Sequence, residues 1–215
     1  MKQYFSYSEF NQWNNYREDF YKNYIEGKDF EPTDAMKLGS LVHKAIEEKN
    51  YPWKKELKEL GMGKRSLAVR KILDRVAIED IEEHEKKLFA TTPKGIELFG
   101  FVDGFCSFGY MYEFKTTDHS EYYNQRVADC QKQMSFYAYM YRLSYFQYFK
   151  RIRIMCLNVK KGTVQFYDTV RSNLDLKKIE EEIHTAVAEM KAEGVWEKRL
   201  SREERAQINQ GKLKL

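Results

Sequence analysis

Apolar side chains recur every three or four residues near the start of the chain, which is the spacing of one buried face of an α-helix. Ser6 stands three residues before Glu9, the arrangement of a capping box, so the first helix is expected to begin there. The apolar stripe of this helix consists of Phe10, Trp13, Tyr16, Phe20 and Tyr24.

Further helices are predicted before position 82. One covers residues 36–49 with Asp34 as its N-cap, and a short one covers residues 53–60. Another runs from Ser66 to about Ile81. This part of the chain is therefore expected to be mainly helical.

The apolar period then shortens to two residues, which is the alternation of a β-strand. Two hairpins are expected, with a long helix between them from about Ser120 to Tyr145. A last helix follows the second hairpin, with Asn173 or Asp175 as its cap. The predicted strands cover residues 87–92, 96–106, 110–117, 151–159 and 163–170.

This order of elements indicates an α/β (α+β) fold, in which a mixed sheet of about five strands is flanked by helices. We expect one domain over residues 1–200, because a chain of 215 residues is long enough for one sizeable core. Within it, residues 1–81 are mainly helical, residues 82–170 hold the sheet and the long helix, and residues 171–200 hold the last helix. Residues 201–215 are polar and are expected to form a tail.

The composition places the chain among folded proteins without a membrane span. Aromatic residues make up 15% of the sequence, which argues against disorder. The sequence has no run of about 18 apolar residues, the length that a membrane-spanning helix needs. The N-terminus also lacks an apolar signal core, so a cytoplasmic protein is expected.

Charge and cysteine usage narrow the classes of partner and site. Lys and Arg number 37 against 33 Asp and Glu, for a formal net charge of +4. That balance permits nucleic-acid binding but would require a local basic patch. The cysteines Cys106, Cys130 and Cys156 form no CxxC pair, so free buried thiols are expected rather than a Cys-only zinc or iron–sulfur site.

Charged side chains interrupt the apolar runs of the first hairpin. Asp103 follows Phe101 and Val102, and Glu113 and Lys115 stand two apart on the paired strand, so the latter two share a face. Carboxylates among apolar neighbours are costly to desolvate unless a cation compensates them. If Asp103 and Glu113 converge, their carboxylates repel each other, and a divalent ion would offset that repulsion. The simpler alternative is an ordinary ion pair between Glu113 and Lys115 on an open sheet face.

The second predicted helix brings one imidazole to this set. Gly39 lies one turn before His43, and Glu47 lies one turn after it on the same face. A glycine at that position lets another backbone or a ligand approach closely. A lone histidine on a helix is more often structural, but here it belongs to a group of candidate ligands.

Short motifs of this kind stand in order between residues 36 and 141. They fall on a helix, a strand, its hairpin partner and the long helix that follows. The motifs are Gly39-x-x-x-His43, Gly100-x-x-Asp103, Glu113-x-Lys115 and Gln133-x-x-x-Tyr137.

Together these motifs resemble the PD-(D/E)XK nuclease superfamily, and most closely its RecB-like branch, which includes CRISPR-associated RecB-like nucleases and phage recombination exonucleases. The resemblance implies a restriction-endonuclease-like core with an N-terminal helical segment. The cysteines that hold an iron–sulfur cluster in several relatives have no counterpart, since residues 171–215 contain no Cys. A metal-dependent enzyme without an iron–sulfur cluster is therefore expected.

The resemblance also implies roles for the site residues. Mg²⁺ or Mn²⁺ would be held by Asp103, Glu113, the backbone carbonyl of Phe114 and His43, whose nitrogen favours Mn²⁺ somewhat. Lys115 would orient the attacking hydroxide and stabilise the transition state.

Several nearby residues have two readings. Gln133 would orient the lysine or a water and Tyr137 would contact DNA or the wall of the site, although both could instead pack the long helix on the sheet. Thr116 and Thr117 could bond a phosphate, or could simply begin a loop. Basic residues on helices are the remaining candidates for backbone contacts to nucleic acid, chiefly Arg126 and Lys132, with Lys64, Arg65, Arg70 and Arg142 as further ones.

The expected function is a metal-dependent DNA nuclease, an exonuclease or end-processing enzyme of phage-type recombination or repair. The alternatives are a non-catalytic DNA-binding subunit that retains the fold, and a site-specific endonuclease. The expected partner is DNA with free ends, single- or double-stranded, with no membrane and with a protein partner in recombination or repair as a further expectation. The sequence leaves the oligomeric state open.

Overall fold

The computed structural model describes residues 4–28, 32–118 and 123–209. It contains a mixed six-stranded sheet flanked by helices, which confirms the predicted fold class. The additional strand is the short β1 (Phe5–Ser6), which pairs in parallel with β3 (Glu97–Cys106). Within the described residues, no helix combines the length and apolar character that crossing a membrane requires.

The N-terminal helical stretch begins at the predicted cap but is interrupted. Ser6 and Glu9 form the capping box of α1 (Tyr7–Asn15). At Tyr16 the backbone leaves the helical region with φ −145° and ψ 60°, so that side chain is 56% exposed rather than part of the apolar stripe. The chain then resumes as α2 (Arg17–Phe20) and the π-helix η1 (Tyr21–Ile25).

The next helices form as predicted with different ends. Thr33, not Asp34, is the N-cap of α3 (Asp34–Glu47), because its hydroxyl accepts a hydrogen bond from the Met36 amide at 3.3 Å. α5 (Ser66–Val76) ends at Val76 rather than near Ile81, and β2 (Glu83–Thr91) begins shortly after it. The remaining elements here are α4 (Trp53–Glu59) and the 3₁₀ turn η2 (Gly63–Arg65).

The sheet has the order β1-β3-β4-β5-β6. β1 and β4 pair with the two ends of one edge of β3, and β2 pairs with the opposite edge. β1 with β3 and β4 with β5 are parallel, and the other pairs are antiparallel. The parallel β4–β5 pair requires the long crossover that α6 (Tyr123–Tyr145) provides. The strand bounds are β2 (Glu83–Thr91), β3 (Glu97–Cys106), β4 (Tyr110–Thr117), β5 (Arg151–Asn158) and β6 (Thr163–Thr169).

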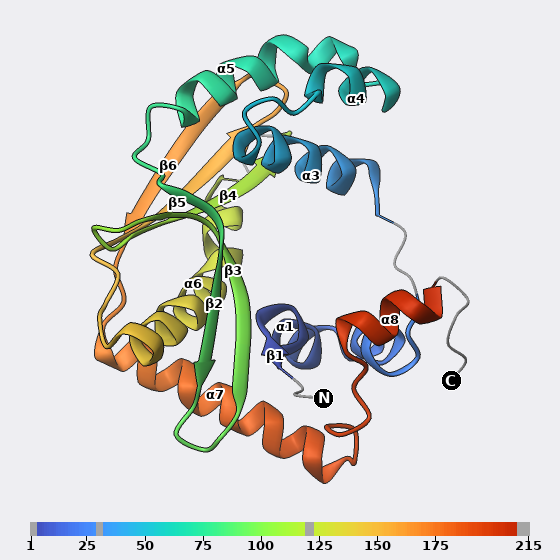
Figure 1. Ribbon diagram of the computed structural model, residues 1–215, viewed down its shortest axis with the longest axis vertical. Helices are drawn as coiled ribbons and strands as arrows, with labels where there is room; N and C mark the ends of the chain where they lie inside the picture. The colour runs from blue at the N-terminus through green and yellow to red at the C-terminus, as the bar shows by residue number, and fades with distance from the viewer. Residues whose placement is uncertain (1–3, 29–31, 119–122, 210–215) are drawn as a thin grey trace.

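Helices cover both faces of the sheet, and two apolar cores result. α3, α4 and α5 enclose one core, which contains Val42, Ile72 and Phe114. α6 (Tyr123–Tyr145) and α7 (Asn173–Ala192) enclose the other, together with α1 (Figure 1). The three cysteines are buried thiols that form no disulfide, as predicted.

The C-terminal part differs from expectation at its caps and in its tail. Ser172 caps α7 and forms a capping box with Asp175, whereas Asn173 is already inside the helix. Residues of the predicted polar tail form α8 (Arg202–Asn209), where Ser201 accepts a hydrogen bond from the Glu204 amide at 3.1 Å.

The two ends of the described chain are joined by buried polar contacts. Arg199 Nη1 lies 2.7 Å from Glu9 Oε1, and both side chains are nearly inaccessible to solvent. The amide of Leu200 also donates to the carbonyl of Tyr24 at 2.7 Å. The first helices are therefore held by the segment of Arg199 and Leu200, which directly precedes α8.

Candidate active site

The site lies where β3 and β4 separate. Their antiparallel ladder runs from Cys106–Tyr110 to Gly104–Tyr112 and then stops. Beyond it, β3 continues along β2 while β4 continues along β5. Asp103, Glu113, Phe114 and Lys115 stand at this divergence, and we call these four residues the fork.

Asp103 bridges the gap between the diverging strands. Its Oδ2 accepts a hydrogen bond from the Phe114 amide at 2.7 Å, so the side chain supplies an acceptor that the ladder no longer offers. The bond fixes the carboxylate beside β4 while Oδ1 is directed to α3. The splayed backbone thereby leaves room for side chains from both layers of helices.

Glu113 and Lys115 face the α6 side of the fork. Glu113 is 1% exposed and its Oε1 lies 2.6 Å from Lys115 Nζ. Lys115 also donates to Gln133 Oε1 at 3.2 Å, and the Gln133 amide nitrogen reaches Tyr137 Oη at 3.4 Å. A polar relay therefore runs from the fork to Tyr137, one helical turn along α6.

Tyr137 also packs against the strand that carries Asp103. A Cβ atom added at Gly100 would lie 2.7 Å from Tyr137 Cε1, closer than real side chains approach. The glycine is thus required for the tyrosine ring to pack this closely against β3. This close approach accounts for the Gly in the Gly100-x-x-Asp103 motif.

His43 reaches the fork from α3 on the other side. Its Nδ1 lies 3.9 Å from Asp103 Oδ1, and its ring packs edge-on against Phe114 with centroids 5.8 Å apart. Burial lowers the pKa of His43, although Glu113 and a hydrogen bond with the Phe114 backbone oppose the shift. The imidazole is therefore neutral near pH 7 and can offer a lone pair. Gly39 leaves room for Thr116, whose Oγ1 would lie 3.0 Å from an added Cβ.

The fork concentrates negative charge in a poorly solvated place. Burial raises the pKa of Asp103 to about 6, although Lys115 and the Phe114 amide oppose the shift. Burial and then the charge of Asp103 raise the pKa of Glu113 to about 7. The pKa of Lys115 is raised as well, because the two carboxylates together outweigh the cost of burying its charge.

These donors fit a divalent cation. Glu113 Oε2 is buried and, among the described residues, has no hydrogen-bond partner. A cation would satisfy that oxygen and offset the repulsion that raises the pKa values of both carboxylates. Asp103, Glu113, the Phe114 carbonyl and His43 are the groups that would hold it.

A second group of side chains that could bind a metal ion lies outside the fork. Among the described residues it is the one group of three such side chains whose ligand atoms all lie within 4.8 Å of one another, and it comprises Asp80, Glu82 and Cys106. The donors of the fork stand farther apart. Glu82 is already engaged by Ser107, whose amide donates to it at 2.8 Å.

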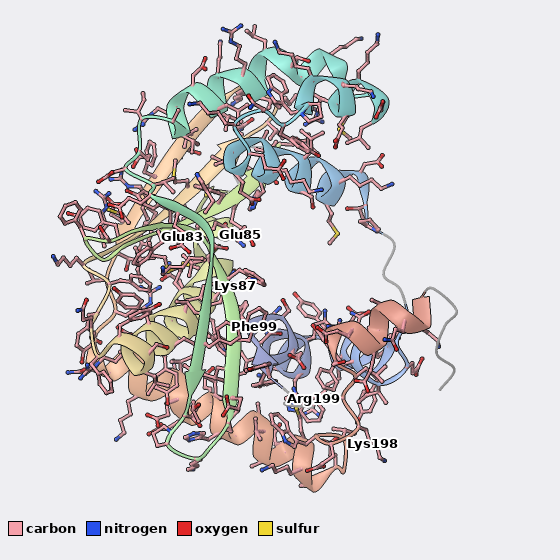
Figure 2. All side chains as sticks on the ribbon, viewed as in Figure 1. Glu83, Glu85, Lys87, Phe99, Lys198 and Arg199 are labelled. Carbon is pink, nitrogen blue, oxygen red and sulfur yellow. The ribbon has the colours of Figure 1, made fainter. Side chains whose placement is uncertain are left out.

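Glu85 is a neighbour of the fork that the sequence did not reveal. It lies on β2 (Figure 2), between His84, which pairs with Gly104, and Lys86, which pairs with Val102. The regular pairing is interrupted at Glu85, whose φ is +49°. Its charge adds to the raised pKa of Asp103. Burial, and then Glu85, also raise the pKa of Glu47 of α3 to about 7. The signal was the alternation of Glu83, Glu85 and Lys87, but its meaning depends on the register with β3.

A cavity of about 1030 Å³ opens beside the fork, between α3 and the end of β4. His43, Lys115, Thr116 and Thr117 line it, which places both predicted phosphate-binding threonines next to the fork. Asp118 lines it too.

Among the side chains that the structure describes, none of the predicted basic residues lines this cavity. Arg65 forms a bidentate ion pair with Asp118, which lines the cavity, and its Nη2 lies 2.9 Å from Asp118 Oδ2. Lys132 Nζ lies 2.8 Å from Glu182 Oε2 of α7, so it faces another helix rather than the fork. Arg70 lies 3.9 Å from Asp74 on the outer face of α5. The side chain of Arg126 lies outside the described residues.

Comparison with known proteins gives support at the level of the fold. No family model and no curated protein matches the sequence. The chain is similar to the crystal structure of a "putative exonuclease" from Eubacterium rectale, with a TM-score of 0.61 and 13% identity over 99% of this chain and 84% of the other. A second match, to the crystal structure of SSO0001, covers 70% of this chain and 73% of the other, at 11% identity and a TM-score of 0.40.

Proposed function

We propose that this chain is a metal-dependent deoxyribonuclease that hydrolyses DNA phosphodiester bonds, acting as an exonuclease or end-processing enzyme. The observation that carries the proposal is the fork. There a buried carboxylate (Glu113), a partly buried one (Asp103), a partly exposed lysine and a neutral imidazole converge beside a cavity of about 1030 Å³. The fold shared with the exonuclease-like structure agrees with this reading.

The metal would be Mg²⁺ or Mn²⁺, held by Asp103, Glu113, the Phe114 carbonyl and His43. When bound, such an ion lowers the pKa of a coordinated water and polarises the scissile phosphate. Asp103 is already oriented by the Phe114 amide, so little rearrangement of that ligand is needed. The nitrogen of His43 favours Mn²⁺ somewhat over Mg²⁺.

Lys115 supplies the positive charge of the reaction. It stays protonated at neutral pH because the carboxylates raise its pKa. It is placed to orient the attacking hydroxide and to stabilise the negative charge that develops on the phosphate. Gln133 holds the lysine, and Tyr137 holds Gln133, so both are positioning residues in this proposal.

Thr116 and Thr117 are the proposed phosphate contacts, because they continue from the fork into the cavity. Lys132 could reach DNA only after releasing Glu182, so we assign it no contact with the reacting phosphate. Membership of the RecB-like branch and a role in phage-type recombination or repair, alongside a protein partner, remain part of the proposal. They rest on the order of the four motifs.

The experiment that tests the proposal compares DNA topologies. Purified protein is incubated with end-labelled linear DNA and covalently closed circles, single- and double-stranded, with Mg²⁺, Mn²⁺ or EDTA. We expect linear DNA to be degraded progressively with either ion, closed duplex circles to resist, and EDTA to abolish cleavage. Asp103→Asn serves as the matched inactive control.

Three other outcomes of this experiment would each contradict the proposal and indicate a different function or site. Binding of DNA without cleavage under every condition would show a non-catalytic DNA-binding subunit that retains the fold. Nicking of closed duplex circles as fast as linear DNA would show an endonuclease that needs no end. Equal cleavage by wild type and Asp103→Asn would show that the activity lies elsewhere.

A further inference from the structure

The outward face of the β2–β3 hairpin is aromatic where it should be polar. Alternate residues of the hairpin are buried against α6, among them Leu88, Ala90 and Leu98, so the others point outward. An antiparallel hairpin with one solvated face normally carries polar side chains there. The outward positions instead hold Phe89, Phe99 and Phe101.

These rings form one continuous surface. The Phe89 and Phe99 centroids are 4.9 Å apart, and those of Phe99 and Phe101 are 4.8 Å apart. Tyr4 extends the surface, with its ring 5.4 Å from that of Phe89. Phe89 is 49% exposed and Tyr4 37% exposed. We call Tyr4, Phe89, Phe99 and Phe101 the aromatic face; exposed apolar patches of this kind mark binding sites.

The aromatic face leads directly to the fork. Phe99, Phe101 and Asp103 are alternate residues of one strand, each about 6.6 Å from the next. In the register of the hairpin, Phe89 stands opposite Phe99 and Lys87 opposite Phe101. The surface is therefore a row of rings that ends at a proposed metal ligand, with a cation beside it.

A second cavity lies over this row. It has a volume of about 640 Å³, within the range of pockets that hold small organic groups. Its lining combines the aromatic face with Lys87, Tyr137 and Arg205. Tyr137 also ends the polar relay from Lys115, so it stands between the fork and this cavity. Figure 2 shows Lys87 and Phe99 along the hairpin, with Arg199 on the segment across this cavity.

We propose that the aromatic face binds the bases of an unpaired nucleic-acid strand whose backbone passes into the fork. The proposal rests on the proposed nuclease function and specifies its substrate as a single strand or a frayed end. Bases in a duplex are stacked on each other and cannot meet these rings. Aromatic side chains stack on any base regardless of sequence, and a neighbouring cation tracks the backbone. The continuity with the fork and the charge of Lys87 favour a nucleic acid over a protein at this patch.

The test measures binding rather than cleavage. Single-stranded oligonucleotides with a fluorescent label are titrated in Ca²⁺ and followed by anisotropy, with a matched duplex for comparison. Phe89→Ala and Phe99→Ala should each weaken single-strand binding by about 5- to 150-fold, the effect of losing one stacked base. Phe108→Ala, which removes a 61% exposed ring from the β3–β4 turn, is the matched control and should bind like wild type. Thermal unfolding checks that each variant is folded.

An oligonucleotide with abasic sites separates stacking from a general change in shape. It keeps the phosphates but offers no ring, so wild type and Phe89→Ala should bind it equally weakly. Equal binding of the normal oligonucleotide by wild type and both variants would overturn the proposal, even if the protein proves to be a nuclease. A dimer that Phe89→Ala dissociates, with single-strand binding unchanged, would show that the face contacts a second copy. Ring-dependent single-strand binding by a protein that cleaves nothing would uphold the face and reject the nuclease function.

Discussion

The carboxylate of Asp103 accepts a hydrogen bond from the amide of Phe114, although the two strands that carry them have already separated. Asp103 thus has one oxygen that secures the backbone of β4 and another that is directed to His43, 3.9 Å away. A substitution that removes the charge but keeps an acceptor oxygen can separate the structural role from the chemical one. Asparagine is such a substitution.

Asp103→Asn, Glu113→Gln and Lys115→Met are each expected to lower DNA cleavage by on the order of 10²–10³ or more, because each removes charge that acts in the transition state. Initial rates on linear DNA with saturating Mn²⁺ give the comparison. Asp74→Asn removes a carboxylate from the exposed face of α5 and should leave the rate unchanged. A folded Asp103→Asn protein with the wild-type rate would contradict the assignment of the fork.

His43→Ala is expected to weaken Mn²⁺ binding by at least about tenfold, because a neutral nitrogen ligand is lost. Titration calorimetry of the metal with the protein alone measures this without any substrate. His184→Ala on α7 is the control, since that imidazole is also partly buried but lies outside the fork. Unchanged affinity with a large fall in melting temperature would show that His43 is a packing residue.

Acid should stabilise the metal-free fork. The pKa of Glu113 rises from 4.5 to about 7 on folding, and that of Asp103 from 3.8 to about 6. The folded state therefore holds these protons more tightly than the unfolded chain, and this stability is lost as pH rises from about 4 to about 7. Thermal melting in EDTA at several pH values between 5 and 8 measures it. Wild type should lose more stability over this range than Glu113→Gln, and parallel curves would refute the raised pKa.

Gly100→Ala should destabilise the protein by about 1–3 kcal/mol, because the new methyl group meets the Tyr137 ring at 2.7 Å. The same change in a Tyr137→Leu background should cost much less, since the ring is gone. Gly63→Ala, where the nearest atom is 3.9 Å away, should be close to neutral. Denaturant unfolding of the four proteins and wild type gives the energies. An equal cost of Gly100→Ala in both backgrounds would show that the two residues do not interact.

Periodicity in the sequence predicted the helices and strands better than their ends. The cap at Ser6 was predicted correctly because Glu9 completes a capping box. Residue type alone could not show that Thr33, rather than the predicted Asp34, caps α3. Both residues are good caps, and only the backbone shows which hydroxyl or carboxylate faces the free amide. α5 ends before the predicted Ile81 because the chain turns there to enter β2.

Parts of the site that depend on short spacing were accessible to sequence reasoning. Glu113 and Lys115 lie two residues apart on one strand, and Gln133 and Tyr137 four apart on one helix, so their relative directions follow from local geometry. Glu85 was not accessible, because its position beside Asp103 depends on which strand pairs with β3 and in which register. The ion pair of Lys132 was not accessible for the same reason, since a helix position does not show that Glu182 of α7 lies opposite.

The buried contact between Glu9 and Arg199 has a consequence for how the protein is made. These residues are separated by 190 positions, which at a synthesis rate of about 5–20 residues per second is roughly 10–40 s of translation. During that interval the nascent N-terminal segment carries Phe10 and Trp13, both fully buried in the finished protein, without the segment that later holds it in place. The first helices to leave the ribosome are therefore among the last to be locked, and they present a natural binding site for chaperones until synthesis passes residue 199.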